Sequence, residues 1–201
     1  MRTIILASNN RKKLQEMQKL LEPAGVTLKP QSEYTSSEAV ENGLTFVENA
    51  LIKARHASEL TGLAAIADDS GLEVDALGGA PGIYSARFAA KPGEGNSSDE
   101  ANNALLLESL RDVSRSKRTA RFQCAIVLQR FPGDPMPLVC QGTWEGLILD
   151  KAAGAHGFGY DPLFFVPTHH CSSAELPPEV KNTLSHRGQA LRQLLDRWPF
   201  K

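Results

Sequence analysis

The sequence has little cysteine, no long apolar run and almost no net charge. Its three cysteines, Cys124, Cys140 and Cys171, are odd in number and widely spaced. This spacing argues against a disulfide scaffold or a zinc site and favours reduced thiols in a cytoplasmic compartment. No segment approaches the roughly 20 apolar residues of a membrane span. The net charge of −1 gives no general reason to expect a nucleic-acid polymer or a membrane as partner.

What is present is typical of a soluble globular protein, with 41% apolar and 22% charged residues. The 201 residues predict a single domain, 1–201, that is long enough for a substantial core. A basic run from Arg111 to Arg121 interrupts two apolar segments. We interpret it as a solvated helix end and loop rather than as a binding patch.

Apolar periodicity predicts strands alternating with helices. Strands are expected at 3–7, 26–28, 64–67, 120–131, 137–149 and 163–166, and helices at about 14–22, 45–60, 97–110 and 187–198. Capping boxes at Thr45/Glu48 and Ser97/Glu100 mark two of the helix starts. Together with one long hairpin, these elements predict an α/β fold with a mixed β-sheet flanked by helices.

Two adjacent carboxylates, Asp68 and Asp69, follow the small-residue strand predicted at 64–67. Adjacent like charges repel, and a buried carboxylate without a partner is costly. Either water solvates both or a positive group belongs beside them. The carboxyl end of a strand is also where α/β folds place their ligands.

Hard cations such as Mg²⁺ prefer oxygen ligands and need only one or two carboxylates besides water and phosphate. Glu41, Glu48, Asp68 and Asp69 are the candidates. Glu48 already has a structural explanation in the capping box, so Glu41 and Asp69 are the favoured metal ligands. In the alternative interpretation Asp68 caps a turn and Asp69 is solvated.

The motif Ser8-x-Asn10-x-x-Lys13 lies between a predicted strand and a helix N-terminus. Unpaired backbone N–H groups there attract anions, and the side chains add donors and a positive charge. The glycines of a Walker A loop are absent. Simple helix capping by Ser8 or Asn10 explains the motif equally well.

Two further stretches carry candidate binding residues. In Gly157–Pro162, the ring of Phe158 could stack on a nucleobase and Asp161 could accept from base N–H groups, although a structural glycine turn is as plausible. In Ser185-His186-Arg187, Ser185 is a plausible N-cap. Arg187 opposes the helix dipole, which indicates a role other than helix stability.

In combination these stretches resemble the inosine/xanthosine triphosphate pyrophosphatase family, which hydrolyses deaminated purine nucleoside triphosphates. The motifs carrying the resemblance are Ser8-x-Asn10-x-x-Lys13, Gly43–Ala50, Ala67–Leu72, Gly78–Arg87, Phe158–Pro162 and Ser185–Arg187. The resemblance implies Mg²⁺-dependent release of a nucleoside monophosphate and pyrophosphate. It also implies an elongated, two-lobed subunit with the active site in the cleft, and a homodimer. Asn9 departs from the glycine that relatives often carry.

The resemblance also implies roles for individual residues. Asp69 would act as metal ligand and general base, and Asp68 would support it. Phosphate oxygens would be held by Ser8, Asn10, Lys13, Lys53, Ser70 and Lys181. The base would contact Phe158, Gly159, Tyr160, Asp161, His186 and Arg187. Arg187, with His186 beside it, would satisfy O6 of the deaminated base and reject adenine.

Two other functions fit parts of the sequence. A nucleotide-binding sensor without hydrolysis would need the same phosphate and base contacts, but not a base beside a metal. A house-cleaning pyrophosphatase for modified pyrimidine triphosphates would share the strand–loop–helix opening. The stretches at 158–161 and 185–187 favour the purine substrates.

Overall fold

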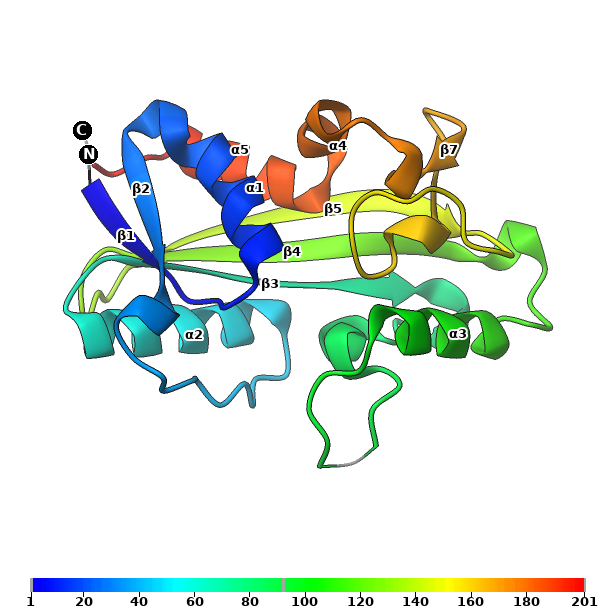
Figure 1. Cartoon of the computed structure of the whole chain (residues 1–201), viewed down its shortest axis with the longest axis horizontal. Coiled ribbons are helices and arrows are strands. Elements are labelled where there is room, and N and C mark those ends of the chain that lie inside the picture. Colours follow the sequence, from blue (N-terminus) through cyan, green and yellow to red (C-terminus); the bar gives the residue numbers. More distant parts are fainter. Residues whose placement is uncertain (1, 92, 201) are drawn as a thin grey trace. The chain divides into compact units, whose positions relative to one another are not determined.

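The computed structural model describes residues 2–91 and 93–200. Within these ranges seven strands form one sheet in the order β2-β1-β3-β4-β5-β6-β7 (Figure 1). Strand β1 pairs in parallel with β2 and β3, whereas β6 pairs antiparallel with β5 and β7. The predicted α/β fold with a mixed sheet and flanking helices is confirmed.

The elements are close to those predicted from periodicity. The strands are β1 (Arg2–Leu6), β2 (Val26–Pro30), β3 (Ala65–Val74), β4 (Thr119–Gln129), β5 (Leu138–Ile148), β6 (Phe164–Val166) and β7 (Cys171–Ser172). The helices are α1 (Arg11–Leu21), α2 (Phe46–Thr61), α3 (Asp99–Ser109), α4 (Pro178–Leu184) and α5 (His186–Asp196). Among the residues that the structure describes, no helix has the length and apolarity needed to cross a membrane.

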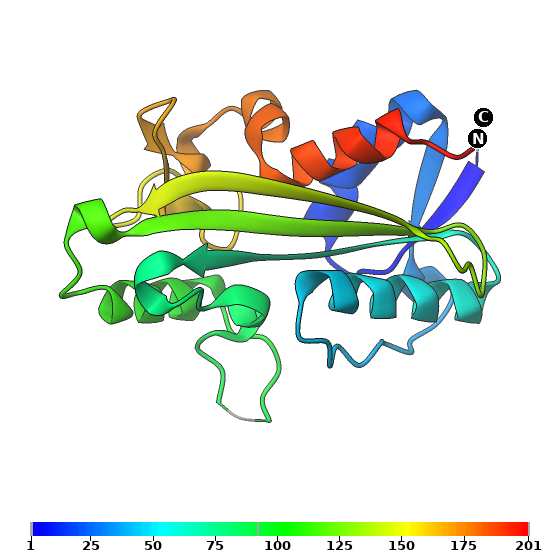
Figure 2. The same ribbon diagram turned by 180° about the vertical axis from the view of Figure 1, so that it is seen from behind.

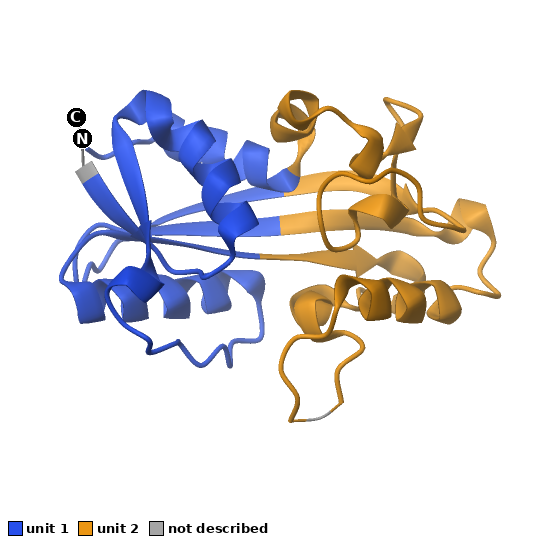
Figure 3. Cartoon of the chain, viewed as in Figure 1, with its two compact units in different colours: residues 1–69, 124–142, 186–201 blue, residues 70–123, 143–185 orange. Residues whose placement is uncertain are grey.

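The chain divides into two compact units (Figure 3). Unit 1 comprises residues 1–69, 124–142 and 186–201, and unit 2 comprises residues 70–123 and 143–185. The boundaries fall inside strands β3, β4 and β5, so these strands supply residues to both units. Neither unit is a continuous stretch of sequence.

Unit 1 has a different core on each face of its strands. Helices α1 and α5 cover one face and α2 covers the other (Figures 1 and 2). Alternation along β1 sends Ile4 and Leu6 to the first face, where large apolar side chains of α1 and α5 pack. Ile5 and Ala7 go to the second face, where alanines of α2, β3 and β4 let the helix approach closely.

Strand β3 is longer than the sequence predicted. The expectation that it ends at Asp68 and Asp69 is wrong, because the strand continues to Val74. Leu72 and Val74 are fully buried in the core of unit 2 and hold this second half of the strand. Strand β1 stops earlier, and its pairing with β3 ends at Leu6 and Ile66. The two aspartates therefore lie just beyond the end of β1.

Helix α2 begins and ends as its sequence predicts. The Thr45 hydroxyl oxygen accepts a hydrogen bond from the Glu48 N–H at 3.1 Å, and Glu48 Oε2 accepts from the Leu44 N–H at 2.8 Å. Gly62 ends the helix with φ of 71°. Glu48 is thus engaged at the helix start, which supports leaving it out of the predicted metal ligands.

The helices of unit 2 differ from prediction in two places. Helix α3 begins at Asp99, and its N-cap is Ser98, whose side chain accepts from the Ala101 N–H; the expected Ser97 cap is wrong. Ser97 instead donates to Asn102 Oδ1 at 2.8 Å. Helix α4 was not predicted, because its seven residues carry too few apolar positions to show a period. Its first residue, Pro178, is the available signal.

Candidate functional site

Asp68 and Asp69 point to opposite faces of the sheet. Successive residues of a strand alternate in direction, so Asp69 shares the α2 face with Ala65 and Ala67. Asp68 shares the α1/α5 face with Ile66. The two adjacent charges that looked anomalous in the sequence therefore meet different cations, and each has its own partner.

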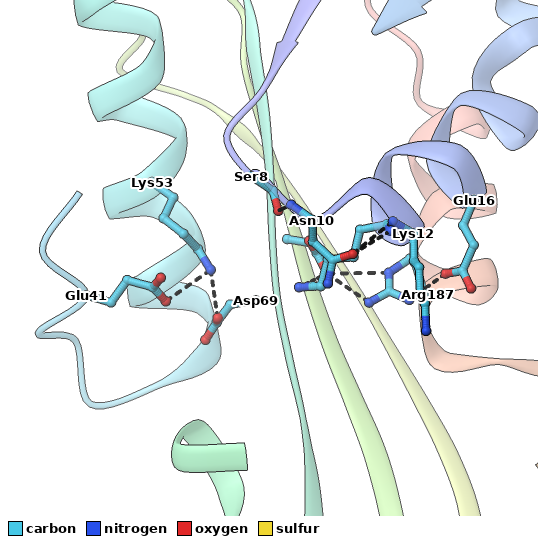
Figure 4. A network of polar contacts seen from close by, with 10 residues as sticks. Ser8, Asn10, Lys12, Glu16, Glu41, Lys53, Asp69 and Arg187 are labelled. Carbon is cyan, nitrogen blue, oxygen red and sulfur yellow. Dashed lines mark hydrogen bonds and ion pairs between the residues drawn. The ribbon is translucent and has the colours of Figure 1, made fainter. Parts of the chain in front are cut away.

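On the α2 face, Lys53 joins two carboxylates. Its Nζ lies 2.8 Å from Asp69 Oδ1 and 3.1 Å from Glu41 Oε2 (Figure 4). Lys53 extends from α2, which is held against the sheet by its buried alanines, whereas Glu41 comes from the irregular segment before that helix. The side chains of Lys53 and Asp69 are 13% and 14% exposed. The predicted residues Glu41, Lys53 and Asp69 are thus brought together.

Burial perturbs the charges of this cluster. Removal from water raises the pKa of Asp69, while the ammonium of Lys53 opposes that rise and Glu41 adds to it. Burial disfavours the charge of Lys53, but Asp69, Asp68 and Glu41 together outweigh it and leave the pKa of Lys53 raised. The result is a charged lysine beside a carboxylate that takes up a proton more readily than an ordinary aspartate.

The donor set suits a hard cation. Oxygens of Glu41 and Asp69 already converge on one positive charge, the Lys53 ammonium. Two carboxylates are sufficient protein ligands for Mg²⁺ when phosphate and water complete the coordination. Within residues 2–91 and 93–200, no three His, Cys, Asp or Glu residues gather as a metal site. A substrate-assisted Mg²⁺ site fits these residues better than a cage made by the protein alone.

On the opposite face, Asp68 forms a buried ion-pair network. Its Oδ2 lies 3.0 Å from Lys13 Nζ and 3.1 Å from Arg187 Nη2, and its side chain is fully buried. Arg187 also reaches Glu16, with Nη1 2.8 Å from Oε2. Burial opposes the charge of Arg187, but Asp68 and Glu16 help to raise its pKa. The sequence suggested a role for Arg187 beyond helix stability, and this network supplies one.

Two members of this arrangement were missed from the sequence. Glu16 lies three residues after Lys13 on α1, so both side chains share one helix face. Gly142 lies on β5, directly under the start of α5. A Cβ at Gly142 would lie 2.0 Å from the His186 carbonyl oxygen, so glycine is required for the approach that seats Arg187. The signal for Gly142 was an isolated glycine inside a strand.

The loop after β1 is shaped by its own side chains. Asn10 Oδ1 accepts from the N–H groups of Lys12 at 2.9 Å and Lys13 at 3.1 Å, and is therefore the N-cap of α1. Ser8 Oγ accepts from the Asn10 N–H at 3.1 Å (Figure 4). Asn9 donates from Nδ2 to Glu38 at 2.7 Å. The capping interpretation of Asn10 is confirmed, and phosphate binding by this loop remains a prediction.

In unit 2, Asp161 organises the glycine-rich turn. Its Oδ2 accepts from Lys181 Nζ at 2.6 Å and from the Phe158 N–H at 2.9 Å, and Oδ1 accepts from Ser173 at 2.8 Å. A Cβ at Gly157 would lie 2.1 Å from Asp161 Oδ2, and φ of 79° there also requires glycine. Asp161 therefore stabilises a glycine turn, and its contact with the base remains a prediction.

The aromatic residues of this turn have distinct environments. Lys181 Nζ lies 5.4 Å from the centre of the half-buried Phe158 ring, a cation–π contact. The buried Tyr160 donates its hydroxyl to the Ser85 carbonyl at 2.8 Å. Burial and then the charge of Asp99 raise the pKa of that hydroxyl. Ser70, another predicted contact, begins the part of β3 in unit 2.

Residues 4–197 match the family model described as the Ham1 family. The chain belongs to the Ham1 family. A relative from Vibrio vulnificus (strain YJ016), named dITP/XTP pyrophosphatase, is 56% identical over 194 residues, which cover 96% of this chain and 95% of the relative. Ham1 structures agree: the protein from Coxiella burnetii has a TM-score of 0.89 and 49% identity over 98% of both chains. The Staphylococcus aureus Ham1 protein has a TM-score of 0.84 and 40% identity, covering 98% of this chain and 97% of that one.

Proposed function

We propose that this Ham1 protein hydrolyses deaminated purine nucleoside triphosphates, such as ITP, dITP, XTP and dXTP, to the monophosphate and pyrophosphate. The observation that carries the proposal is the 56% identity, over nearly the whole length of both chains, to a relative named dITP/XTP pyrophosphatase. The convergence of Glu41 and Asp69 on a single positive charge supports it from the chemistry of the site. Removal of such triphosphates keeps them out of DNA and RNA.

In this proposal the residues of the α2 face act on the triphosphate. Asp69 removes a proton from the attacking water as a general base. Glu41 and Asp69 would hold Mg²⁺. The bound ion would neutralise phosphate charge and orient the triphosphate for attack by water. Lys53 adds a positive charge beside them. Lys13, Ser8 and Asn10 contribute charge and donors at the start of α1.

Base selection is assigned to the residues predicted to contact the base. Arg187 donates to O6 of hypoxanthine or xanthine, whereas adenine offers an amino donor there. Asp68 and Glu16 fix the guanidinium through ion pairs of 3.1 and 2.8 Å, so that it is oriented before the substrate arrives. A site organised around such a hydrogen bond rejects the wrong partner by up to ~10⁴-fold. Comparing the ITP to ATP ratio of kcat/KM in wild type and Arg187→Ala tests this assignment; an unchanged ratio excludes it.

The first test is hydrolysis of ITP and GTP with and without Mg²⁺, with phosphate and pyrophosphate resolved chromatographically. We expect metal-dependent IMP and pyrophosphate, with GTP largely spared. Asp69→Asn should lower turnover by at least about 100-fold, the contribution of a general base. Wild-type turnover in that variant would remove the base assignment.

Two further measurements, of ITP binding and of the turnover of modified pyrimidine triphosphates, test the other functions. ITP binding without turnover indicates a sensor, and faster turnover of modified pyrimidine triphosphates indicates a pyrimidine pyrophosphatase. Release of single phosphates would place the attack elsewhere along the triphosphate.

We also propose that the protein is a cytoplasmic homodimer. Light scattering after gel filtration measures its molar mass and so tests the oligomeric state.

A further inference from the structure

Helix α3 holds both backbone polar groups of Gly159, and so the peptide group on each side of that residue. Asp99 Oδ2 accepts from the Gly159 N–H at 2.7 Å, and Asn103 Nδ2 donates to the Gly159 carbonyl at 3.0 Å. Asp99 and Asn103 are four residues apart and therefore share one face of the helix. All three residues belong to unit 2. The turn and the helix are separated by more than 50 residues of sequence, so this clamp is a tertiary contact.

The remaining polar groups of the turn are also engaged. The Phe158 N–H donates to Asp161 at 2.9 Å, and the Phe158 carbonyl accepts from the Asp161 N–H at 3.3 Å. The Tyr160 carbonyl accepts from the Leu163 N–H at 3.0 Å. The turn is thus held both by Asp161, one of its own residues, and by side chains of α3. The conformation of the turn therefore depends on α3 as well as on the residues of the turn itself.

We propose that Asp99 and Asn103 are positioning residues that fix the orientation of the Phe158 ring for recognition of the nucleobase. The inference rests on the proposed function, because it gives this turn a base to bind. Phe158 shares a peptide group with the Gly159 N–H that Asp99 holds, so a rotation of that peptide group would redirect its ring. The clamp acts on base affinity and not on the reacting phosphates, since neither residue belongs to the cluster around Lys53.

The proposal predicts which constants change. Asp99→Ala and Asn103→Ala should each raise KM for ITP by about 3- to 10-fold, the effect of one lost hydrogen bond, and leave kcat within about twofold. Asp99→Asn keeps a side-chain oxygen that can accept from the Gly159 N–H, and should restore most of the loss. The double alanine variant should lose less than the product of the single effects, because both contacts hold the backbone of one residue, Gly159.

The experiment measures binding and turnover separately in the full-length protein. Isothermal titration calorimetry gives the Kd of IMP and of pyrophosphate for each variant, and steady-state assays give kcat and KM for ITP. Glu100→Ala is the matched control, since Glu100 is an exposed acidic residue in the same helical turn. We expect weaker IMP binding in the two alanine variants, unchanged pyrophosphate binding, and no effect of Glu100→Ala.

Other results overturn the proposal in distinguishable ways. Unchanged IMP affinity in both alanine variants excludes the positioning role, and so does a proportional loss of IMP and pyrophosphate binding, which indicates general loosening. If Asp99→Asn behaves like Asp99→Ala, the carboxylate acts through its charge and not as the acceptor of a positioning hydrogen bond. A wild-type protein that neither hydrolyses ITP nor binds IMP instead refutes the proposed function, and with it the recognition role.

Discussion

The opposite placement of the two aspartates predicts opposite effects of two matched substitutions. Asp68→Asn removes the charge from a fully buried side chain that contacts Lys13 at 3.0 Å and Arg187 at 3.1 Å. Arg187 would stay buried with Glu16 as its remaining carboxylate partner. Breaking a buried ion pair in this way costs about 3 to 5 kcal/mol. For a chain of this length we expect a melting temperature lower by about 6 to 20 °C.

Asp69→Asn should leave the fold nearly unaffected. Burial already disfavours the Asp69 carboxylate, and an amide oxygen can still accept from Lys53, which keeps its ion pair with Glu41 at 3.1 Å. We expect the free energy of unfolding to change by less than about 1 kcal/mol, the net contribution of one hydrogen bond. Turnover should nevertheless fall by at least about 100-fold.

Urea unfolding followed by circular dichroism and by tryptophan fluorescence measures the difference. Trp198 lies in unit 1 and Trp144 in unit 2, so tryptophan fluorescence reports on both units. Coincidence of the circular dichroism and fluorescence transitions tests for a single unfolding transition. The reasoning from alternating strand directions is refuted if Asp69→Asn lowers stability as much as Asp68→Asn. It is equally refuted if Asp68→Asn is as stable as wild type.

Three further predictions follow from the described contacts. Gly142→Ala should lower the free energy of unfolding by about 3 kcal/mol, because the new Cβ meets the backbone of His186; equal stability in urea would contradict the close approach. Asp134→Asn should be less stable than wild type at neutral pH, since hydrogen bonds from Arg130 lower the pKa of Asp134. A lowered folded pKa stabilises above the unfolded value, so this difference should shrink as thermal melts are taken below about pH 4. Removal of divalent cations with EDTA should abolish ITP hydrolysis, and added Mg²⁺ should restore it, while turnover that persists in EDTA would exclude the proposed metal.

The fold was largely predictable because most elements carry a clear apolar period. Strand β3 shows the limit: it was predicted to end at residue 67, but the burial of Leu72 and Val74 accompanies its continuation to residue 74. Local propensity could not reveal this, since the stabilising contacts come from residues distant in sequence. Helix α4 was missed because its seven residues are too few to display an apolar period.

The site was predictable in its members but not in their pairing. Lys53, Asp68 and Asp69 were all among the predicted site residues, but the sequence did not indicate that the partner of Lys53 is Asp69 rather than Asp68. That choice depends on which face of β3 each aspartate occupies, and therefore on a strand continuing where the sequence suggested a stop. Gly142 and Glu16 were missed for a further reason: their roles exist only once α5 lies on the sheet, although Gly142 carried the signal of an isolated glycine inside a strand.

The network around Asp68 has a consequence for the order of synthesis. Lys13 has left the ribosome before Asp68 is made, but Arg187 is separated from Asp68 by 119 residues and is synthesised much later. Asp68 on strand β3 cannot be buried with both of its cationic partners, Lys13 and Arg187, until α5 has been synthesised. During elongation, Asp68 must therefore remain hydrated or depend on Lys13 alone. Completion of unit 1 is thereby delayed until α5 has been synthesised, and a ribosome stalled before residue 187 would hold a chain whose first 69 residues are present but not yet closed.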